Sequence, residues 1–350
     1  MAKEDSSSVD QGTANPTYEA TASGVALLRR RGRRFLAVEG MSPGDMLKGI
    51  LSGRIPDPLS NPVNGWREGE ISYSTVLTPK GKMVSDLRLF PSGEGGFLLD
   101  LPLTGLEGAL AHFKKYLNPR FAQLRNRSEE LGMLTVVGPG GRDLVSGVLG
   151  FEVPAPGIGE ARLRSGESVP ELWALGNDEI DAQVMDLILP LKILEEVRGQ
   201  MEEAGARPMD AGTWEVLRIE AGTPLYGVDM TEDTIPVEAG IHERAIDYQK
   251  GCFTGQEVII RLRDRGQVNK TLFWIFLGDS GIPESGAELF GTDSGKKVGW
   301  VTSACRSPKY GQTIALGFIK RGVGPGDEVR LGGPQGPAAR VVDPGGEASA

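Results

Sequence analysis

Cysteine and histidine are scarce in this chain, which has two of each among 350 residues. Two cysteines cannot build a disulfide framework, and their small number is typical of a reducing compartment, so we expect a cytoplasmic protein. The sequence has no Cys-x-x-Cys pair and no finger-like spacing of His and Cys. It therefore predicts no metal site: neither a tightly held zinc ion nor a four-cysteine iron–sulfur cluster within one chain.

Long apolar runs and an excess of basic residues are also missing. No stretch approaches the roughly 20 apolar residues that span a bilayer, and residues 1–21 lack the basic and apolar regions of a secretion signal, so no membrane partner is expected. The formal net charge of −9 argues against direct non-specific binding of nucleic acid, which requires Lys and Arg to neutralise phosphates.

What the chain has in abundance is turn-forming residues, with 50 glycines and 23 prolines. Residues 1–23 are rich in Ser, Asp, Thr and Ala, which predicts a disordered N-terminal tail. In residues 24–270 hairpins alternate irregularly with helices, which indicates an α+β fold with largely antiparallel sheets. Residues 271–345 contain short strands joined by Gly/Pro turns, which indicates a small C-terminal antiparallel β-barrel. Because Gly, Pro and Ala dominate residues 332–350 after the first few positions, we expect the extreme C-terminus to be loose.

Hydrophobic periodicity and turn residues predict the individual elements. Strands are expected at 34–38, 70–77, 83–90, 97–101, 132–137 and 184–189, helices at 43–51, 104–117, 143–149 and 190–203, and barrel strands at 271–277, 297–302, 312–319 and 327–331. Thr104 and Glu107 form a capping box at the start of one helix. His112 lies off the apolar stripe of that helix, so we expect it at the surface.

The most informative motif is Lys-Gly-Cys-Phe-Thr-Gly-Gln-Glu at residues 250–257. Thr254 and Glu257 read as a second capping box, which places Cys252 just before the positive end of a helix. Lys250 lies two residues away, and both influences favour a thiolate. Cys252 and Lys250 are therefore the candidate catalytic residues. The alternative for a lone cysteine is a buried and inert side chain.

This motif resembles the signature of the YgfZ-type folate-binding proteins, which include mitochondrial proteins of iron–sulfur cluster assembly. That family is similar in fold to the glycine cleavage T-protein, a folate-dependent aminomethyltransferase. Blocks at 77–89, 217–227, 236–240 and 299–317 stand in the family's order. The resemblance implies a three-lobed ring of ferredoxin-like modules followed by a barrel, tetrahydrofolate as the cofactor, and iron–sulfur client proteins, including enzymes that modify tRNA, as partners.

The resemblance also implies roles for single residues. The Glu of an Arg-x-Glu-Ala-Gly block, which holds the pterin in the T-protein fold, carries over to Glu220; the alternative is a solvated acid. Asp86 is a candidate for orienting the ligand, or a polar strand residue. The T-protein has a catalytic acid where we align Ser85. It also has an arginine near residues 248–249, where this chain has none. Both differences count against aminomethyl transfer.

On the helix after the cysteine motif, Arg261 and Arg263 are candidates for the glutamate tail of folate; a solvated face shared with Asp264 is the equal alternative. The sequence thus favours a tetrahydrofolate-binding protein that supports assembly or repair of iron–sulfur enzymes through Cys252. Two alternatives are a folate-dependent aminomethyl- or methyltransferase and a non-catalytic scaffold that senses folate.

Overall fold

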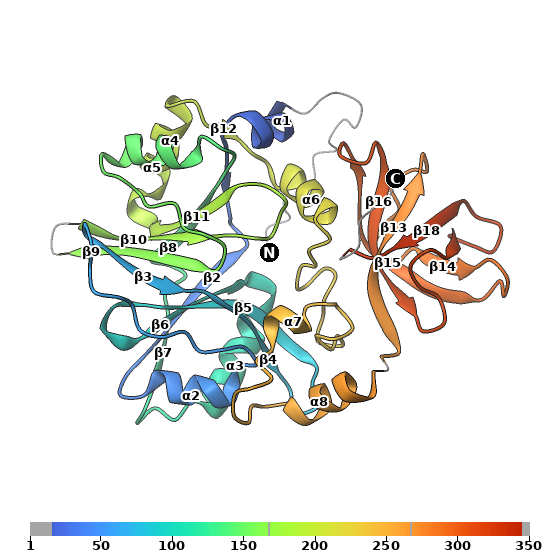
Figure 1. The fold of residues 1–350 in the computed structure, drawn as a ribbon, viewed down its shortest axis with the longest axis horizontal. Helices are drawn as coiled ribbons and strands as arrows, with labels where there is room; N and C mark the ends of the chain where they lie inside the picture. The colour runs from blue at the N-terminus through green and yellow to red at the C-terminus, as the bar shows by residue number, and fades with distance from the viewer. Residues whose placement is uncertain (1–15, 167–168, 267, 345–350) are drawn as a thin grey trace.

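The computed structural model describes residues 16–344 except 167–168 and 267, and places them in two open β-sheets, a closed barrel and surrounding helices (Figure 1). The larger sheet has the order β12-β1-β8-β11-β10-β9-β3, in which only the β1–β12 pair is parallel among the described strands. Its strands are β12 (Arg207–Pro208), β1 (Ala26–Arg29), β8 (Leu131–Val137), β11 (Val184–Pro190), β10 (Val169–Gly176), β9 (Glu160–Gly166) and β3 (Trp66–Glu70).

The smaller sheet is antiparallel throughout, with the order β4-β5-β6-β2-β7. Its strands are β4 (Ser72–Leu77), β5 (Met83–Pro91), β6 (Phe97–Pro102), β2 (Arg33–Glu39) and β7 (Gln123–Asn126). Alternate side chains along a strand serve two different cores. On β2, Phe35 and Ala37 face the larger sheet, whereas Leu36 and Val38 face the helices on the other side.

These two cores make the sheet lobe a four-layered structure. Phe35, Phe90 and Leu98 pack against Trp173 and Ile188 of the larger sheet to fill the space between the sheets. The outer face of the larger sheet is covered by α4 (Gly141–Leu149) and α5 (Leu191–Glu203), and that of the smaller sheet by α2 (Pro43–Ile50) and α3 (Leu106–Tyr116). Both sheets are therefore buried on two faces, which explains their long apolar runs.

The barrel closes through β13-β16-β15-β14-β17-β18, with β13 paired to both β16 and β18. Its strands are β13 (Lys270–Gly278), β14 (Glu288–Gly291), β15 (Lys297–Ser307), β16 (Gln312–Lys320), β17 (Glu328–Leu331) and β18 (Ala338–Val342). Ile275, Val301 and Val329 fill its interior. Closure leaves no open edge strand, so short strands suffice for stability.

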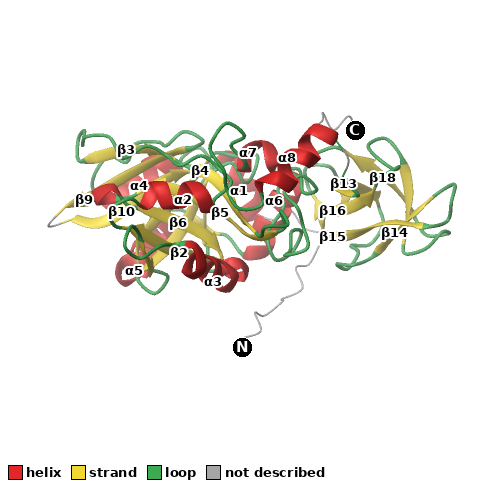
Figure 2. Ribbon diagram, turned by 90° about the horizontal axis from the view of Figure 1, so that it is seen from below, coloured by secondary structure: helices red, strands yellow, loops and turns green. Residues whose placement is uncertain are grey.

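The remaining helices lie between the sheets and the barrel, as both ribbon views show (Figures 1 and 2). They are α1 (Pro16–Ser23), α6 (Ala211–Glu220), α7 (His242–Ala245) and α8 (Gln256–Arg265), and short 3-10 turns lie at η1 (Gly93–Gly95) and η2 (Leu103–Gly105). Trp274 of the barrel donates its indole N–H to the carbonyl of Ile219 at 2.7 Å, which ties β13 to α6. None of the helices in the described part of the chain is long and apolar enough to cross a bilayer.

The α+β class, the antiparallel sheets and the closed barrel confirm the expected fold. Disorder was the wrong expectation for residues 16–23, which form α1 because Ala20 packs into an apolar cluster with Trp214 and Leu217 of α6. Residues 1–15 lie outside the described part of the chain. The looseness expected at the extreme C-terminus falls on residues 345–350, which lie outside the described part of the chain; β18 pairs with β13 and β17 within the barrel.

Both expected capping boxes are wrong. Helix α8 begins after Gly255, and both the N–H and the hydroxyl of Thr254 are directed to the carbonyl of Gly49, at 3.1 and 3.5 Å. Helix α3 begins after Gly105, and the Thr104 hydroxyl donates to the carbonyl of Tyr226 at 2.9 Å. In each case the threonine hydroxyl donates to a backbone carbonyl far away in the sequence instead of capping the helix, as the local pattern predicted.

His112 is a further correction, because it is buried rather than at the surface. Its ring lies 4.5 Å from that of Tyr116, and burial lowers its pKa to about 4. The imidazole is therefore neutral at physiological pH and acts as part of the packing of α3.

Candidate functional site

A cavity of about 220 Å³ opens where the sheets meet α6 and α7. Its charged and phenolic lining residues come from both sheets and from these helices: Arg33, Tyr73, Asp86, Arg88, Asp178, Glu179, Arg218 and Arg244. Its apolar lining consists of Ile71, Ile158, Trp214, Pro224 and Leu225. We call this the Asp86 cavity. Among the described lining residues, only Asp86 has a buried side-chain oxygen without a hydrogen-bond partner.

Asp86 presents one occupied and one free oxygen. Its Oδ2 accepts a hydrogen bond from the Tyr73 hydroxyl at 2.7 Å, whereas its Oδ1 is buried without a partner in the described structure. Burial raises the pKa of Asp86, and the charge of Arg33 opposes that rise. A buried acceptor without a partner costs free energy. Oδ1 is therefore the atom that would accept a hydrogen bond from a bound ligand.

Ser85, the neighbouring residue on β5, points away from the cavity. Its hydroxyl donates to the carbonyl of Asp86 at 2.8 Å, and its side chain fills the space beside Gly105, where an added Cβ would meet Ser85 Oγ at 2.1 Å. Because neighbouring strand residues face opposite sides, only Asp86 can serve the cavity. Ser85 therefore does not face this cavity, and Asp86 is the carboxylate that β5 presents to it.

Four arginines line the cavity, and three of them are neutralised by close partners. Arg33 binds Asp100 at 2.7 Å, Arg88 binds both Asp100 and Asp186 at 2.6 Å, and Arg218 binds Asp229 at 2.7 Å.

Arg244 is different from the other three. Its guanidinium lies 3.8 Å from Asp178, 4.3 Å above the ring of Tyr73, and its side chain is 34% exposed. Residues 248–249 are Tyr and Gln, as the sequence shows, and Arg244 of α7 lines the cavity a few residues earlier in the chain.

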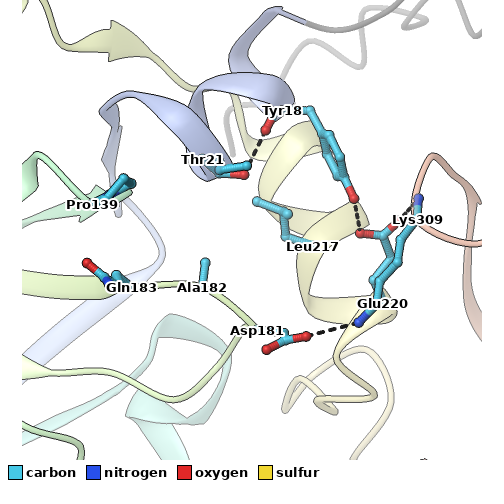
Figure 3. A pocket seen from close by; sticks show the side chains of 10 residues that line it. Tyr18, Thr21, Pro139, Asp181, Ala182, Gln183, Leu217, Glu220 and Lys309 are labelled. Atoms are coloured by element: carbon cyan, nitrogen blue, oxygen red, sulfur yellow. Dashed lines mark hydrogen bonds and ion pairs between the residues drawn. The ribbon is translucent and has the colours of Figure 1, made fainter.

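Glu220 lies in a different cavity, of about 400 Å³, between α1, α6 and the barrel (Figure 3). Its Oε2 accepts from the Tyr18 hydroxyl at 2.7 Å, and its Oε1 accepts from the Lys309 N–H at 3.0 Å and from the Ser307 hydroxyl. Figure 3 shows the Tyr18 ring directed at the carboxylate. Glu220 is 3% exposed and is not a solvated acid; both its oxygens already have protein donors.

The cysteine motif lies apart from both cavities, none of whose described lining residues belongs to it. Cys252 is exposed in the segment before α8. The Lys250 ammonium donates to the carbonyls of Gly53, at 2.8 Å, and Leu51, and burial lowers its pKa to about 8. Lys250 therefore ties this segment to the chain after α2.

Arg261 and Arg263 are exposed on α8. Arg261 pairs with Glu257 at 2.8 Å, and Arg263 pairs with Asp264 at 2.7 Å and lies 4.6 Å from the centre of the Tyr248 ring. Of the candidate residues, the structure places Asp86 alone in the cavity between the sheets.

Sequence reasoning missed Tyr73, Arg244 and Trp214 as lining residues of the Asp86 cavity. The hairpin of β4 and β5 was predicted, and its register brings Tyr73 opposite Arg88 and Thr75 opposite Asp86. That register, had it been known, would have placed Tyr73 near Asp86. Nothing in the local sequence indicates that Arg244 lies over the Tyr73 ring.

The fold and this cavity define a class of protein in which a two-sheet α+β lobe is followed by a closed barrel. Residues 270–344 match the family model described as the glycine cleavage T-protein C-terminal barrel domain. The crystal structure of the glycine cleavage system aminomethyltransferase T from Bartonella henselae has the same fold. Its TM-score is 0.79 at 18% identity, and the match covers 94% of this chain and 87% of that one.

Curated relatives agree with this class. The aminomethyltransferase of Rubrobacter xylanophilus is 30% identical over 265 residues, which cover 75% of this chain and 69% of that protein. The aminomethyltransferase of Staphylococcus haemolyticus is 28% identical over 282 residues, which cover 78% and 74%. The chain belongs to the aminomethyltransferase family, the family of the glycine cleavage T-protein.

Proposed function

We propose that this protein binds tetrahydrofolate in the Asp86 cavity and takes part in folate-dependent aminomethyl transfer. The observation that carries the proposal is the buried Oδ1 of Asp86, which has no partner in the described structure and faces a cavity. An ionised carboxylate there accepts an N–H of the folate. It is also placed to take the proton that a folate amine loses when the one-carbon group is transferred.

The size and lining of the cavity suit one part of such a ligand. A volume of about 220 Å³ is below the roughly 300–1,000 Å³ of pockets that enclose drug-sized ligands, so we propose that it holds a ring system and leaves the tail outside. Apolar Ile158 and Trp214 would contact the ring faces. Arg244, whose ion pair with Asp178 is long at 3.8 Å, would meet an anionic tail before Arg261 or Arg263.

Glu220 remains a proposed pterin anchor on the resemblance alone. Because its Oε2 holds the Tyr18 hydroxyl and its Oε1 holds Ser307 and Lys309, a pterin would have to displace at least one of these donors. The Asp86 cavity needs no such displacement, which is why we place the ligand there.

Calorimetric titration with tetrahydrofolate tests this placement. Asp86→Asn should weaken binding about 10- to 100-fold, as expected when a hydrogen bond to a charged group is lost. Ser85→Ala is the matched control, because that side chain points away from the cavity, and it should bind normally. Equal affinity of wild type and Asp86→Asn would contradict the proposal. Glycine-dependent formation of methylenetetrahydrofolate with a lipoylated carrier then tests the transfer itself.

A second candidate function is YgfZ-type support of iron–sulfur enzymes, among them tRNA-modifying enzymes, through Cys252. The exposure of Cys252 within its motif, apart from the Asp86 cavity, favours it. The two functions can be distinguished in a strain that lacks the gene for this protein, by measuring the activities of iron–sulfur enzymes after variants are reintroduced. Cys252→Ser should fail to restore them if the thiol is required. Full rescue by Cys252→Ser, together with turnover that depends on Asp86, would leave the transferase function alone.

A further inference from the structure

Tyr73 and Asp86 lie on the two strands of one hairpin. The register pairs Thr75 with Asp86 and Tyr73 with Arg88, so Tyr73 and Asp86 are diagonal neighbours on the same face of the smaller sheet. Their side chains meet in the hydrogen bond of 2.7 Å from the phenol to Oδ2. The contact therefore depends on the register of two paired strands rather than on a mobile loop.

The Tyr73 ring also contacts a cation. The guanidinium of Arg244 lies 4.3 Å from the centre of the Tyr73 ring, in cation–π geometry. Burial and the neighbouring charge of Asp86 raise the pKa of Tyr73 well above its usual value. The phenol therefore keeps its proton at any physiological pH and can always donate to Asp86.

We propose that Tyr73 is the positioning residue for Asp86: it holds Oδ2, directs Oδ1 into the cavity and stabilises the carboxylate charge. Tyr73 need not touch the ligand to do this, because it acts through Asp86. Oδ2 accepts its hydrogen bond from the protein, and Oδ1 remains as the single acceptor directed into the cavity. The proposal deepens the proposed function and rests on it only where ligand binding is measured.

The charge of Asp86 depends on groups from every element packed around it. They are Arg33 of β2, Tyr73 of β4, Arg88 of β5, Glu179 and Asp178 after β10, Arg218 of α6, Tyr226 after α6, and Arg244 of α7. Burial raises the pKa of Asp86, and the Tyr73 hydrogen bond lowers it. Removing that hydroxyl should therefore raise the pKa of Asp86 further.

The pKa of Asp86 can be measured in the unliganded protein from the pH dependence of its carboxyl carbon NMR signal, assigned by its loss in Asp86→Asn. We expect Tyr73→Phe to raise it by about one pH unit or more. Tyr226→Phe is the matched control: it removes a buried phenol hydroxyl that is not hydrogen-bonded to Asp86 in the described structure, and it should shift the pKa much less than Tyr73→Phe does. If Tyr73→Phe does not fold, 3-fluorotyrosine at Tyr73 is a stronger donor and should lower the pKa instead.

Tetrahydrofolate affinity measured across pH gives the second readout. Because the ionised carboxylate is the acceptor, binding is lost as the pH falls through the pKa of Asp86, and Tyr73→Phe should move this loss to higher pH by the same amount. An unchanged Asp86 pKa in Tyr73→Phe, or in the fluorotyrosine protein, overturns the positioning role. A shifted pKa in a protein that binds no tetrahydrofolate supports the positioning role and refutes the proposed function.

Discussion

At the scale of single residues, the neighbours Ser85 and Asp86 show that the side of a strand on which a residue lies decides whether it can reach the cavity. The alignment of motifs placed Ser85 at the position of an acid, whereas the pleat of β5 turns Ser85 towards Gly105 and Asp86 towards the cavity. A shift of one residue in a strand exchanges the two faces of the sheet. The chemistry of the site therefore depends on which of two adjacent side chains is directed inwards.

Asp86→Asn should make the folded protein more stable at neutral pH while it weakens ligand binding. Burial raises the pKa of Asp86, so the folded state holds that proton more tightly than the unfolded state. Stability due to this group is then greatest at low pH and is lost as the pH rises through the folded pKa. We expect a gain of about 0.5–2 kcal/mol in the free energy of unfolding at pH 7, as when a site loses a destabilising functional group.

Urea unfolding of wild type and Asp86→Asn at several pH values measures this. The difference between them should shrink as the pH falls from the raised folded pKa of Asp86 to the ordinary pKa of an aspartate, below which the group is protonated in both states. A less stable variant at pH 7 would mean that the carboxylate is a net stabilising group, held by Tyr73 and Arg244.

Cys252 should be alkylated at least about 100-fold faster than Cys305 at neutral pH. The reason differs from the one that the sequence suggested, because α8 begins at Gln256 without the expected capping box. The contrast comes instead from Cys305, which is buried, and burial raises its pKa to about 12. Single-cysteine variants labelled in the folded state measure both rates. In urea the two rates should converge; similar rates in the folded protein would contradict the burial of Cys305.

At the scale of elements, helix starts were the least predictable feature. A capping box is a local pattern, yet the hydroxyls of Thr104 and Thr254 donate to backbone carbonyls more than 100 residues away in sequence, at Tyr226 and Gly49. By contrast, Asp210 does cap α6, accepting from the N–H of Thr213 at 2.7 Å. Whether a polar side chain caps its own helix depends on which competing acceptors the fold brings near.

Gly255→Ala should destabilise the protein more than Gly266→Ala does. Both glycines flank α8 with positive φ, of 85° and 61°. An added Cβ at Gly255 would lie 2.6 Å from the carbonyl oxygen of Thr78, in the β4–β5 turn, whereas at Gly266 it would meet no atom of the described residues within 4 Å. The backbone penalty of about 1 kcal/mol is shared, and the clash adds about 1–3 kcal/mol at Gly255 alone.

The comparison is made by chemical denaturation of the two variants beside the wild type. Because the two sites share the helix and the sign of φ, their difference isolates the contact between α8 and the hairpin that carries Asp86. Equal losses would mean that α8 is not held against that turn.

At the scale of the whole molecule, Glu220 joins three parts of the chain. Its carboxylate accepts from Tyr18 of α1, and from Ser307 and Lys309 of the barrel, while Glu220 itself ends α6. Close by, Trp274 of the barrel donates to the α6 carbonyl of Ile219. The barrel is therefore docked on α6 through directed hydrogen bonds as well as apolar contacts.

Glu220→Gln should lower the free energy of unfolding by about 1–3 kcal/mol, because an amide can no longer accept from all three donors. Thermal and urea unfolding measure the loss, and Glu257→Gln, an exposed acid on α8, is the control that should change little. Tetrahydrofolate titration of the same variant separates the two proposed roles. A stability loss with unchanged affinity assigns Glu220 to docking; a loss of affinity alone assigns it to the pterin.

The sequence by itself determined the class of the fold, since short apolar runs bounded by turn residues specify β2, β5, β6 and the barrel strands. It also determined Asp86 as a candidate, because its motif is contiguous. Only the tertiary structure decided that Tyr73, Arg244 and Asp86 meet, since these residues lie on three elements joined by strand register and helix packing. It likewise decided that the Glu220 carboxylate accepts hydrogen bonds from Tyr18, Ser307 and Lys309, because partners far apart in the chain leave no local sequence pattern.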